Sequence, residues 1–112
     1  MRLLVDTHIP LRVLSDDPRL NPKDRSVLLY AQETIVSAAS IWEISIKRAL
    51  GKLKASENLL EHVKAAGYLP LSVTWVHAET AGALSPHHAD PFDRLLIAQT
   101  QYEGLTILTK DS

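Results

Sequence analysis

Short apolar runs alternate with longer segments of helical periodicity along the whole chain. Four runs are typical of short buried strands: RLLVD (2–6), TIVS (34–37), YLPLSV (68–73) and LTILT (105–109). The apolar spacing between them predicts helices over 8–17, 21–32, 37–50, 56–67, 74–84 and 90–104. Strands that alternate with helices indicate an α/β fold, with three layers and a short central parallel sheet covered by helices on both faces.

Several residues mark where these elements begin and end. Asn21 is a helix cap, and the third helix starts at Ser37 or Ser40 and stops at Gly51. Pro70 interrupts the third apolar run, so we expect that strand to be short or to lie at an edge of the sheet.

Composition narrows the class of protein. The 112 residues are 46% apolar and 22% charged, which is typical of one globular domain over 1–112 rather than a disordered chain. No run approaches the roughly 20 apolar residues of a membrane span, and the N-terminal run is too short for a signal peptide. The chain has no cysteine, which excludes disulfides, thiolate metal sites and cysteine nucleophiles. A cytoplasmic location is the default expectation.

The charge is nearly balanced, with a formal net charge of −1. Binding to a nucleic acid would therefore need a local basic patch rather than bulk positive charge. One such cluster exists, formed by Lys47, Arg48, Lys52 and Lys54. The same cluster is equally explained as a solvated helix end, where cations favour the helix dipole.

Two aspartates lie at the carboxyl ends of apolar runs. Asp6 comes after the first run and Asp111 after the last, so both lie at the carboxyl ends of strands, where sites form in parallel α/β sheets. A plain structural explanation also exists for each. Asp6 is suited to a strand-to-helix turn, and Asp111 is the penultimate residue of the chain.

Glu43 has three interpretations. It completes a capping box with Ser40, or it pairs with Lys47 four residues later. Alternatively, it is drawn into the interior, where an unpaired charge is costly and suggests a function. The third interpretation is favoured because its neighbours on the helix face are apolar: Ala39, Ile46 and Leu50.

The segment HHADPFDRLL (87–96) places two more acids at a helix start. Asp90 is a helix cap followed by Pro91 at the first helical position, and Asp93 falls at the third position. The following LLIA is apolar on every side, which predicts a centrally buried helix with Asp93 inside the fold. If Asp6, Glu43, Asp93 and Asp111 share one cleft, they need a counter-charge, and Mg²⁺ or Mn²⁺ suits all-oxygen ligands.

At this point the sequence resembles a known family, the PIN-domain ribonucleases, and within it the VapC-type toxins of toxin–antitoxin pairs. The resemblance runs through LLVDTH, VSAASIWEISIKRALGKL, HHADPFDRLLIAQ and LTILTKD, and so covers almost the whole chain. It implies a PIN-like α/β/α fold and metal-dependent hydrolysis of RNA phosphodiester bonds. It also implies a homodimer and a cognate antitoxin protein as partners.

The resemblance assigns roles residue by residue. Asp6, Glu43, Asp93 and Asp111 would be catalytic and would hold Mg²⁺ or Mn²⁺, with Asp6 and Asp93 as the central ligands. Position and charge, rather than the resemblance, suggest supporting roles for other residues. Thr7 and Thr109 flank the acids and would orient them, as would Ser40 unless it only caps its helix. The basic residues would contact RNA: Lys47, Arg48, Lys52 and Arg94. Family members continue past the last aspartate with another short helix and strand. We therefore expect either a truncated form or a sheet without its final edge strand.

Other classes of function remain open. His8 follows Asp6 and is expected near the proposed site, and His87 and His88 precede the Asp90 cap. The chain lacks the His spacing of a zinc site, and His62 and His77 are typical of amphipathic helices. A phosphatase that uses Asp6 as nucleophile would need a second acid two residues later, where the chain has a histidine. A catalytically idle relative that binds only RNA or a protein is the remaining alternative.

Overall fold

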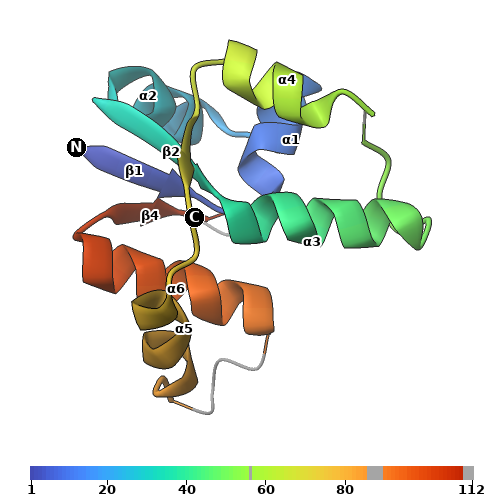
Figure 1. The fold of residues 1–112 in the computed structure, drawn as a ribbon. Helices are drawn as coiled ribbons and strands as arrows, with labels where there is room; N and C mark the ends of the chain where they lie inside the picture. The colour runs from blue at the N-terminus through green and yellow to red at the C-terminus, as the bar shows by residue number, and fades with distance from the viewer. Residues whose placement is uncertain (56, 86–89, 110–112) are drawn as a thin grey trace.

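The computed structural model describes residues 1–55, 57–85 and 90–109, and these form a four-stranded sheet flanked by helices (Figure 1). The strands are β1 (Arg2–Val5), β2 (Glu33–Ser37), β3 (Leu69–Leu71) and β4 (Thr106–Leu108). The helices are α1 (His8–Leu14), α2 (Pro22–Tyr30), α3 (Ala38–Ala49), α4 (Leu59–Ala65), α5 (Trp75–Gly82) and α6 (Pro91–Glu103). None of these described helices is long and apolar enough to cross a membrane.

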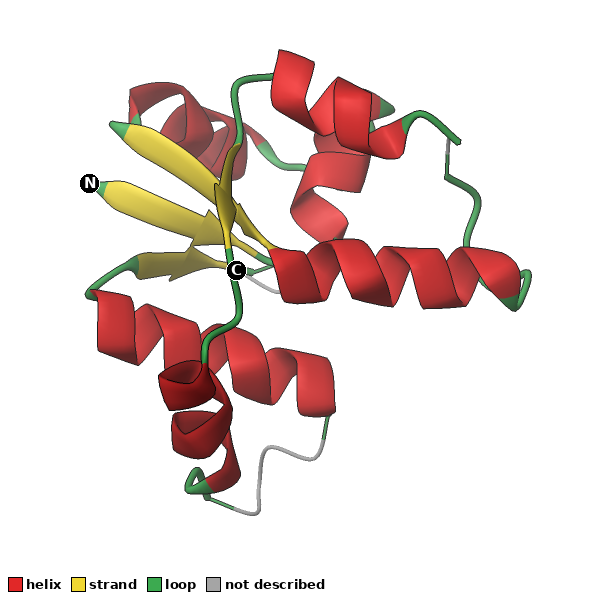
Figure 2. Ribbon diagram, in the orientation of Figure 1, coloured by secondary structure: helices red, strands yellow, loops and turns green. Residues whose placement is uncertain are grey.

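The sheet is parallel throughout, in the order β3-β2-β1-β4. The predicted α/β class is therefore confirmed. The arrows of β1, β2 and β4 in Figure 2 point toward the start of α3, so their carboxyl ends meet at one edge of the sheet. The strand around Pro70 has three residues and lies outermost beside β2, as the proline predicts.

Alternating residues of β1 enter two separate cores. Leu3 and Val5 pack with buried residues of α1, α3 and α4, whereas Leu4 packs with Leu96 of α6 on the opposite face. Figure 1 shows the same layers, with α1, α2 and α4 on one side of the sheet and α5 and α6 on the other. Leu3, Leu4 and Val5 are consecutive apolar residues in this strand because both faces of the sheet are covered.

Helix starts follow the local signals in the sequence. The Asn21 side chain accepts a hydrogen bond from the Asp24 amide, which confirms the predicted cap of α2. Ser37 caps α3 by accepting a hydrogen bond from the Ala39 amide, so this helix begins one residue later, at Ala38. Of the two starts that the sequence left open, Ser37 is the cap, and the alternative capping box of Ser40 with Glu43 is excluded because the helix is already under way at Ser40.

Truncation of Leu4 tests the smaller core. Leu4 is 0% exposed, and we expect Leu4→Ala to lower the free energy of unfolding by about 3 kcal/mol through lost burial and a residual cavity. Urea unfolding measures the change. Leu29, which is 77% exposed, provides the matched control, and Leu29→Ala is expected to stay within about 0.5 kcal/mol of the parent chain. An equal loss of unfolding free energy in Leu4→Ala and Leu29→Ala would contradict the packing of Leu4 in the core.

Candidate active site

Asp6 lies where β1 ends and α1 begins, and its carboxylate is held by backbone amides. Its Oδ1 accepts hydrogen bonds from the amides of His8 at 2.9 Å and Ile9 at 3.3 Å. Asp6 is buried, and its own amide donates to the carbonyl of Leu108 at the end of β4. Asp6 therefore has the structural role of a turn aspartate, and the same bonds fix its carboxylate at the carboxyl edge of the sheet.

Thr7 connects this turn to Glu43 in the second turn of α3. The Thr7 hydroxyl donates to Glu43 Oε1 at 2.6 Å and lies 3.2 Å from Ser40 Oγ. Thr7, Ser40 and Glu43 are all buried. A carboxylate in that position is drawn inward, as its apolar neighbours predict, and the structure pairs it with a hydroxyl from a different element.

Lys47 supplies the charge that balances Glu43. Its Nζ lies 2.6 Å from Glu43 Oε2, which confirms the predicted pair four residues apart. The hydrogen bond that Lys47 donates to Glu43 is the main cause that raises the pKa of Lys47, and burial opposes it. The carboxylates of Asp90 and Asp93 raise this pKa further. The acids at the start of α6 and the Glu43 cluster thus act on the same cation.

Asp93 lies in the first turn of α6, and its side chain is exposed. The prediction that Asp93 lies inside the fold is therefore wrong. Asp90 caps the helix through the amides of Phe92, at 2.8 Å, and Asp93, at 3.4 Å, which confirms its predicted role. The burial of α6 begins at Leu96, so the first turn extends beyond the sheet while the apolar segment behind it enters the core.

The structure thus brings together part of the predicted acidic quartet. Asp6 and Glu43 lie on either side of Thr7, and Asp93 acts on Lys47 from α6. Asp111, His87 and His88 lie outside the described residues, whereas Thr109 follows β4 within them. In the ranges 1–55, 57–85 and 90–109, no three His, Asp or Glu side chains gather closely enough to hold a metal ion. The buried donors that are present are carboxylate oxygens, which suit a hard divalent cation rather than zinc.

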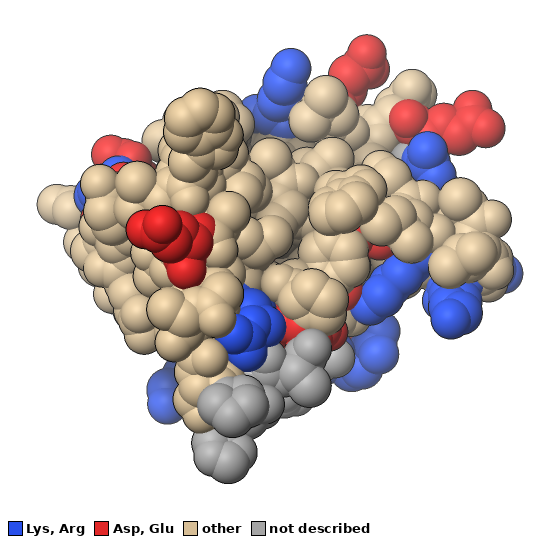
Figure 3. Space-filling model, turned by 60° about the horizontal axis from the view of Figure 1, so that its bottom comes forward, with Lys and Arg blue, Asp and Glu red and all other residues tan. Residues whose placement is uncertain are grey.

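The predicted basic residues differ in their surroundings. Lys47 is bound to Glu43, whereas Arg48 and Lys52 are exposed at and beyond the end of α3. The Arg94 guanidinium donates to backbone carbonyls at the end of α5, among them that of Ala81 at 2.7 Å. Figure 3 shows acidic side chains recessed near the centre of one face, with basic side chains on both sides of them.

One buried residue has a role that the sequence did not reveal. His77 lies on the buried face of the amphipathic helix α5, and its ring is fully buried between α5 and α6. Its Nδ1 accepts from the Thr74 amide, and its Nε2 lies 2.8 Å from Glu103 Oε2. A histidine three residues after a threonine cap was the only available signal. His77 holds α6, and with it the acids at the helix start, against α5.

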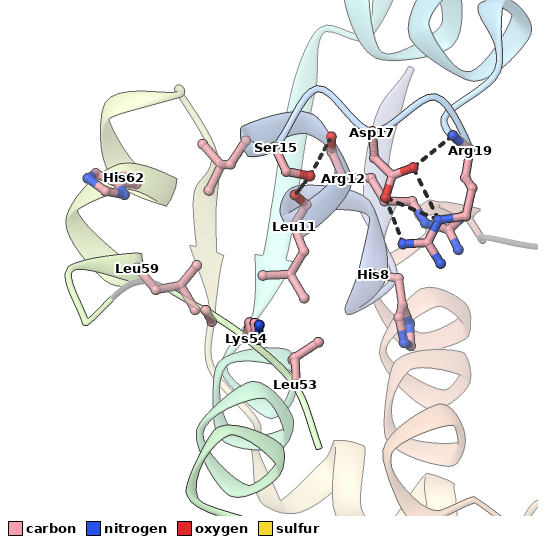
Figure 4. A pocket seen from close by; sticks show the side chains of 12 residues that line it. His8, Leu11, Arg12, Ser15, Asp17, Arg19, Leu53, Lys54, Leu59 and His62 are labelled. Carbon is pink, nitrogen blue, oxygen red and sulfur yellow. Dashed lines mark hydrogen bonds and ion pairs between the residues drawn. The ribbon is translucent and has the colours of Figure 1, made fainter. Parts of the chain in front are cut away.

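A cavity of about 420 Å³ lies between α1 and α4 (Figure 4). His8 lines one part of it and follows the Asp6–Thr7 turn. Leu11, Leu53 and Leu59 give the cavity an apolar lining, and charged side chains also line it: Arg12, Asp17, Arg19 and Lys54. Arg19 is bound to Asp17, whose pKa it lowers to about 2.

Comparison with known proteins identifies the family. The model of the PIN domain matches residues 3–112, and the chain belongs to the PIN domain family. No curated protein is a significant match to the sequence. Dependence on divalent metal is general among PIN-domain nucleases.

Solved structures share the fold at low sequence identity. A toxin–antitoxin complex from Klebsiella pneumoniae has a TM-score of 0.66 at 14% identity, over 94% of this chain and 82% of that one. VapBC2 from Rickettsia felis, bound to a DNA fragment from its promoter, has a TM-score of 0.67 at 14% identity, and the match covers 96% of this chain and 86% of that one. DNA-bound VapBC from Salmonella typhimurium has a TM-score of 0.66 at 16% identity, and the match covers 97% of this chain and 86% of that one.

Proposed function

We propose that residues 1–112 act as one PIN domain that hydrolyses RNA phosphodiester bonds with Mg²⁺ or Mn²⁺. The observation that carries the proposal is the buried Asp6–Thr7–Glu43 cluster at the carboxyl edge of the sheet, in a chain of the PIN domain family. Asp6 and Glu43 are 37 positions apart in the sequence, and Thr7, which follows Asp6 directly, bonds to Glu43. Burial of two carboxylates costs free energy, which supports a functional role for them.

Each residue of the cluster has a separate task in this proposal. Asp6 and Glu43 would hold the ion together with Asp93 and Asp111. A divalent ion bound there would activate water and neutralise charge on the phosphate oxygens. The amides of His8 and Ile9 fix the carboxylate of Asp6, and the Thr7 hydroxyl fixes that of Glu43. Because these bonds already order the two carboxylates, little conformational entropy would be lost when the ion binds.

We further propose that the chain is the toxin of a toxin–antitoxin pair, acts in the cytoplasm and forms a homodimer. The proteins of similar fold are toxin–antitoxin complexes. The cavity between α1 and α4 suits an amphipathic acidic segment of the cognate antitoxin, because Arg12 and Lys54 line it together with its leucines. Occupation of this cavity beside His8 would also obstruct the approach of RNA to Asp6.

Removal of metal is the direct test of the reaction. We expect the purified protein to cleave single-stranded RNA in Mn²⁺ or Mg²⁺, to lose all cleavage in excess EDTA, and to regain it when Mn²⁺ exceeds the chelator. Gel analysis of an end-labelled RNA measures each step. Cleavage that persists in EDTA would refute the metal-dependent mechanism. Binding of RNA without cleavage in either ion would instead favour the catalytically idle relative.

A further inference from the structure

Trp42 is a large aromatic residue left exposed beside the acids. Of its surface, 61% is accessible, although it belongs to α3, whose neighbouring Glu43 and Ile44 are buried. Its ring packs against Phe92, with centroids 5.4 Å apart and planes inclined by 71°. This edge-to-face contact holds the indole in one orientation while most of its surface stays available to a ligand.

The aromatic pair joins the two helices that carry proposed catalytic acids. Trp42 directly precedes Glu43 on α3, and Phe92 directly precedes Asp93 on α6. The amide of Phe92 is in turn held by the Asp90 cap. The position of Trp42 is therefore fixed relative to the acids by the same turn of helix that presents Asp93.

A nucleic acid needs more than positive charge to bind here. The formal net charge is −1, and Lys47 is already engaged with Glu43. Proteins that bind single strands add affinity by stacking bases on exposed aromatic rings, which works with any sequence. If an RNA strand places one phosphate at Glu43 and Asp93, a base next to that phosphate can reach Trp42, which precedes Glu43 on the same helix.

We propose that Trp42, oriented by Phe92, is the stacking platform for a base adjacent to the cleaved phosphate. The inference rests on the proposed ribonuclease function and specifies its substrate as single-stranded RNA with an unpaired, splayed base. Trp42 contributes to binding of the substrate and not to the bond-breaking step.

The two tryptophans of the chain make the test direct. Trp75 is 94% exposed but belongs to α5, away from the acids, so Trp75→Phe leaves Trp42 as the only tryptophan reporter. In that variant we expect a short oligoadenylate to quench the fluorescence, with Ca²⁺ present to slow cleavage. An abasic oligonucleotide of equal length should not quench it, because it offers phosphates without bases.

Kinetics give the second measurement. We expect Trp42→Ala to raise KM for single-stranded RNA roughly 5- to 100-fold with little change in kcat, and Trp42→Phe to recover most of the loss. Trp75→Ala is the control, with KM unchanged. Circular dichroism confirms that each variant is folded.

The outcomes separate the two proposals. Quenching by the oligoadenylate alone supports stacking even if the protein never cleaves RNA, because this readout needs no catalysis. Equal quenching by both oligonucleotides, or an unchanged KM in Trp42→Ala, overturns the role of Trp42 and leaves the ribonuclease proposal intact. If Trp42→Ala converts a dimer to a monomer by ultracentrifugation with equal affinity per chain, Trp42 is a subunit contact and the proposal is wrong.

Discussion

Asp93→Asn is expected to lower kcat for RNA cleavage by at least about 10³-fold. Lewis-acid stabilisation by a metal ion is worth several kcal/mol, and each 1.4 kcal/mol is about tenfold in rate. The amide keeps the shape of the side chain but lacks the charge that holds a cation. Because Asp93 is exposed in the first turn of α6, its replacement should cost the fold only a few tenths of a kcal/mol. Initial rates on labelled RNA and thermal unfolding separate the two effects.

Asp90 provides the matched control three residues earlier. Asparagine caps helices as well as aspartate does, so Asp90→Asn preserves the bonds to the amides of Phe92 and Asp93. We expect its activity to stay within about threefold of the parent, since the change leaves the cap energetically intact. A loss as large in Asp90→Asn as in Asp93→Asn would show that the cap is itself a ligand.

The sequence predicted the fold well because the relevant signals are local. The alternation of apolar runs with helical segments reports burial of the sheet on both faces, and caps such as Asn21 and Asp90 fix where helices begin. The sequence left the cap of α3 open between Ser37 and Ser40, because two serines three residues apart are both suitable caps. The choice of Ser37 depends on where β2 ends, which local sequence does not determine.

The site was only partly predictable because its bonds join distant segments. Nothing near Thr7 in the sequence indicates that its hydroxyl reaches Glu43, 36 residues away. The exposure of Asp93 depends on how far α6 projects beyond the sheet, and the burial of His77 depends on how α5 crosses α6. The contact between Trp42 and Phe92 has the same origin. Residue type revealed the acids, whereas the aromatic pair required the tertiary arrangement.

In this structure, Lys47 is the positive charge that balances the buried carboxylate of Glu43. It binds one oxygen of Glu43 while Thr7 binds the other, so both oxygens are engaged in the structure. A metal ion that approaches Glu43 meets either electrostatic repulsion from Lys47 or a competitor for the same oxygen. Lys47 thus stabilises the metal-free protein and weakens metal binding. A substitution of Lys47 should therefore lower the stability of the metal-free protein and raise its affinity for the metal ion.

Lys47→Met should therefore destabilise the metal-free protein and strengthen its affinity for Mn²⁺. Without Lys47, the buried carboxylate of Glu43 loses its partner, which costs about 2 kcal/mol for a pair whose cation is partly exposed. Removal of the competing charge should tighten Mn²⁺ binding about tenfold or more. Excess Mn²⁺ then restores much of the lost stability. Urea unfolding with and without Mn²⁺, together with titration calorimetry, measures both changes.

Lys52→Met removes the same charge at an exposed position beyond α3, and it should change neither stability nor Mn²⁺ affinity appreciably. If Lys47→Met and Lys52→Met bind Mn²⁺ equally, the ion does not approach Glu43, and Glu43 would be a structural carboxylate rather than a ligand. If the affinity for Mn²⁺ rises only in Lys47→Met, the buried carboxylate of Glu43 belongs to the metal site, and Lys47 stabilises that site in its metal-free form.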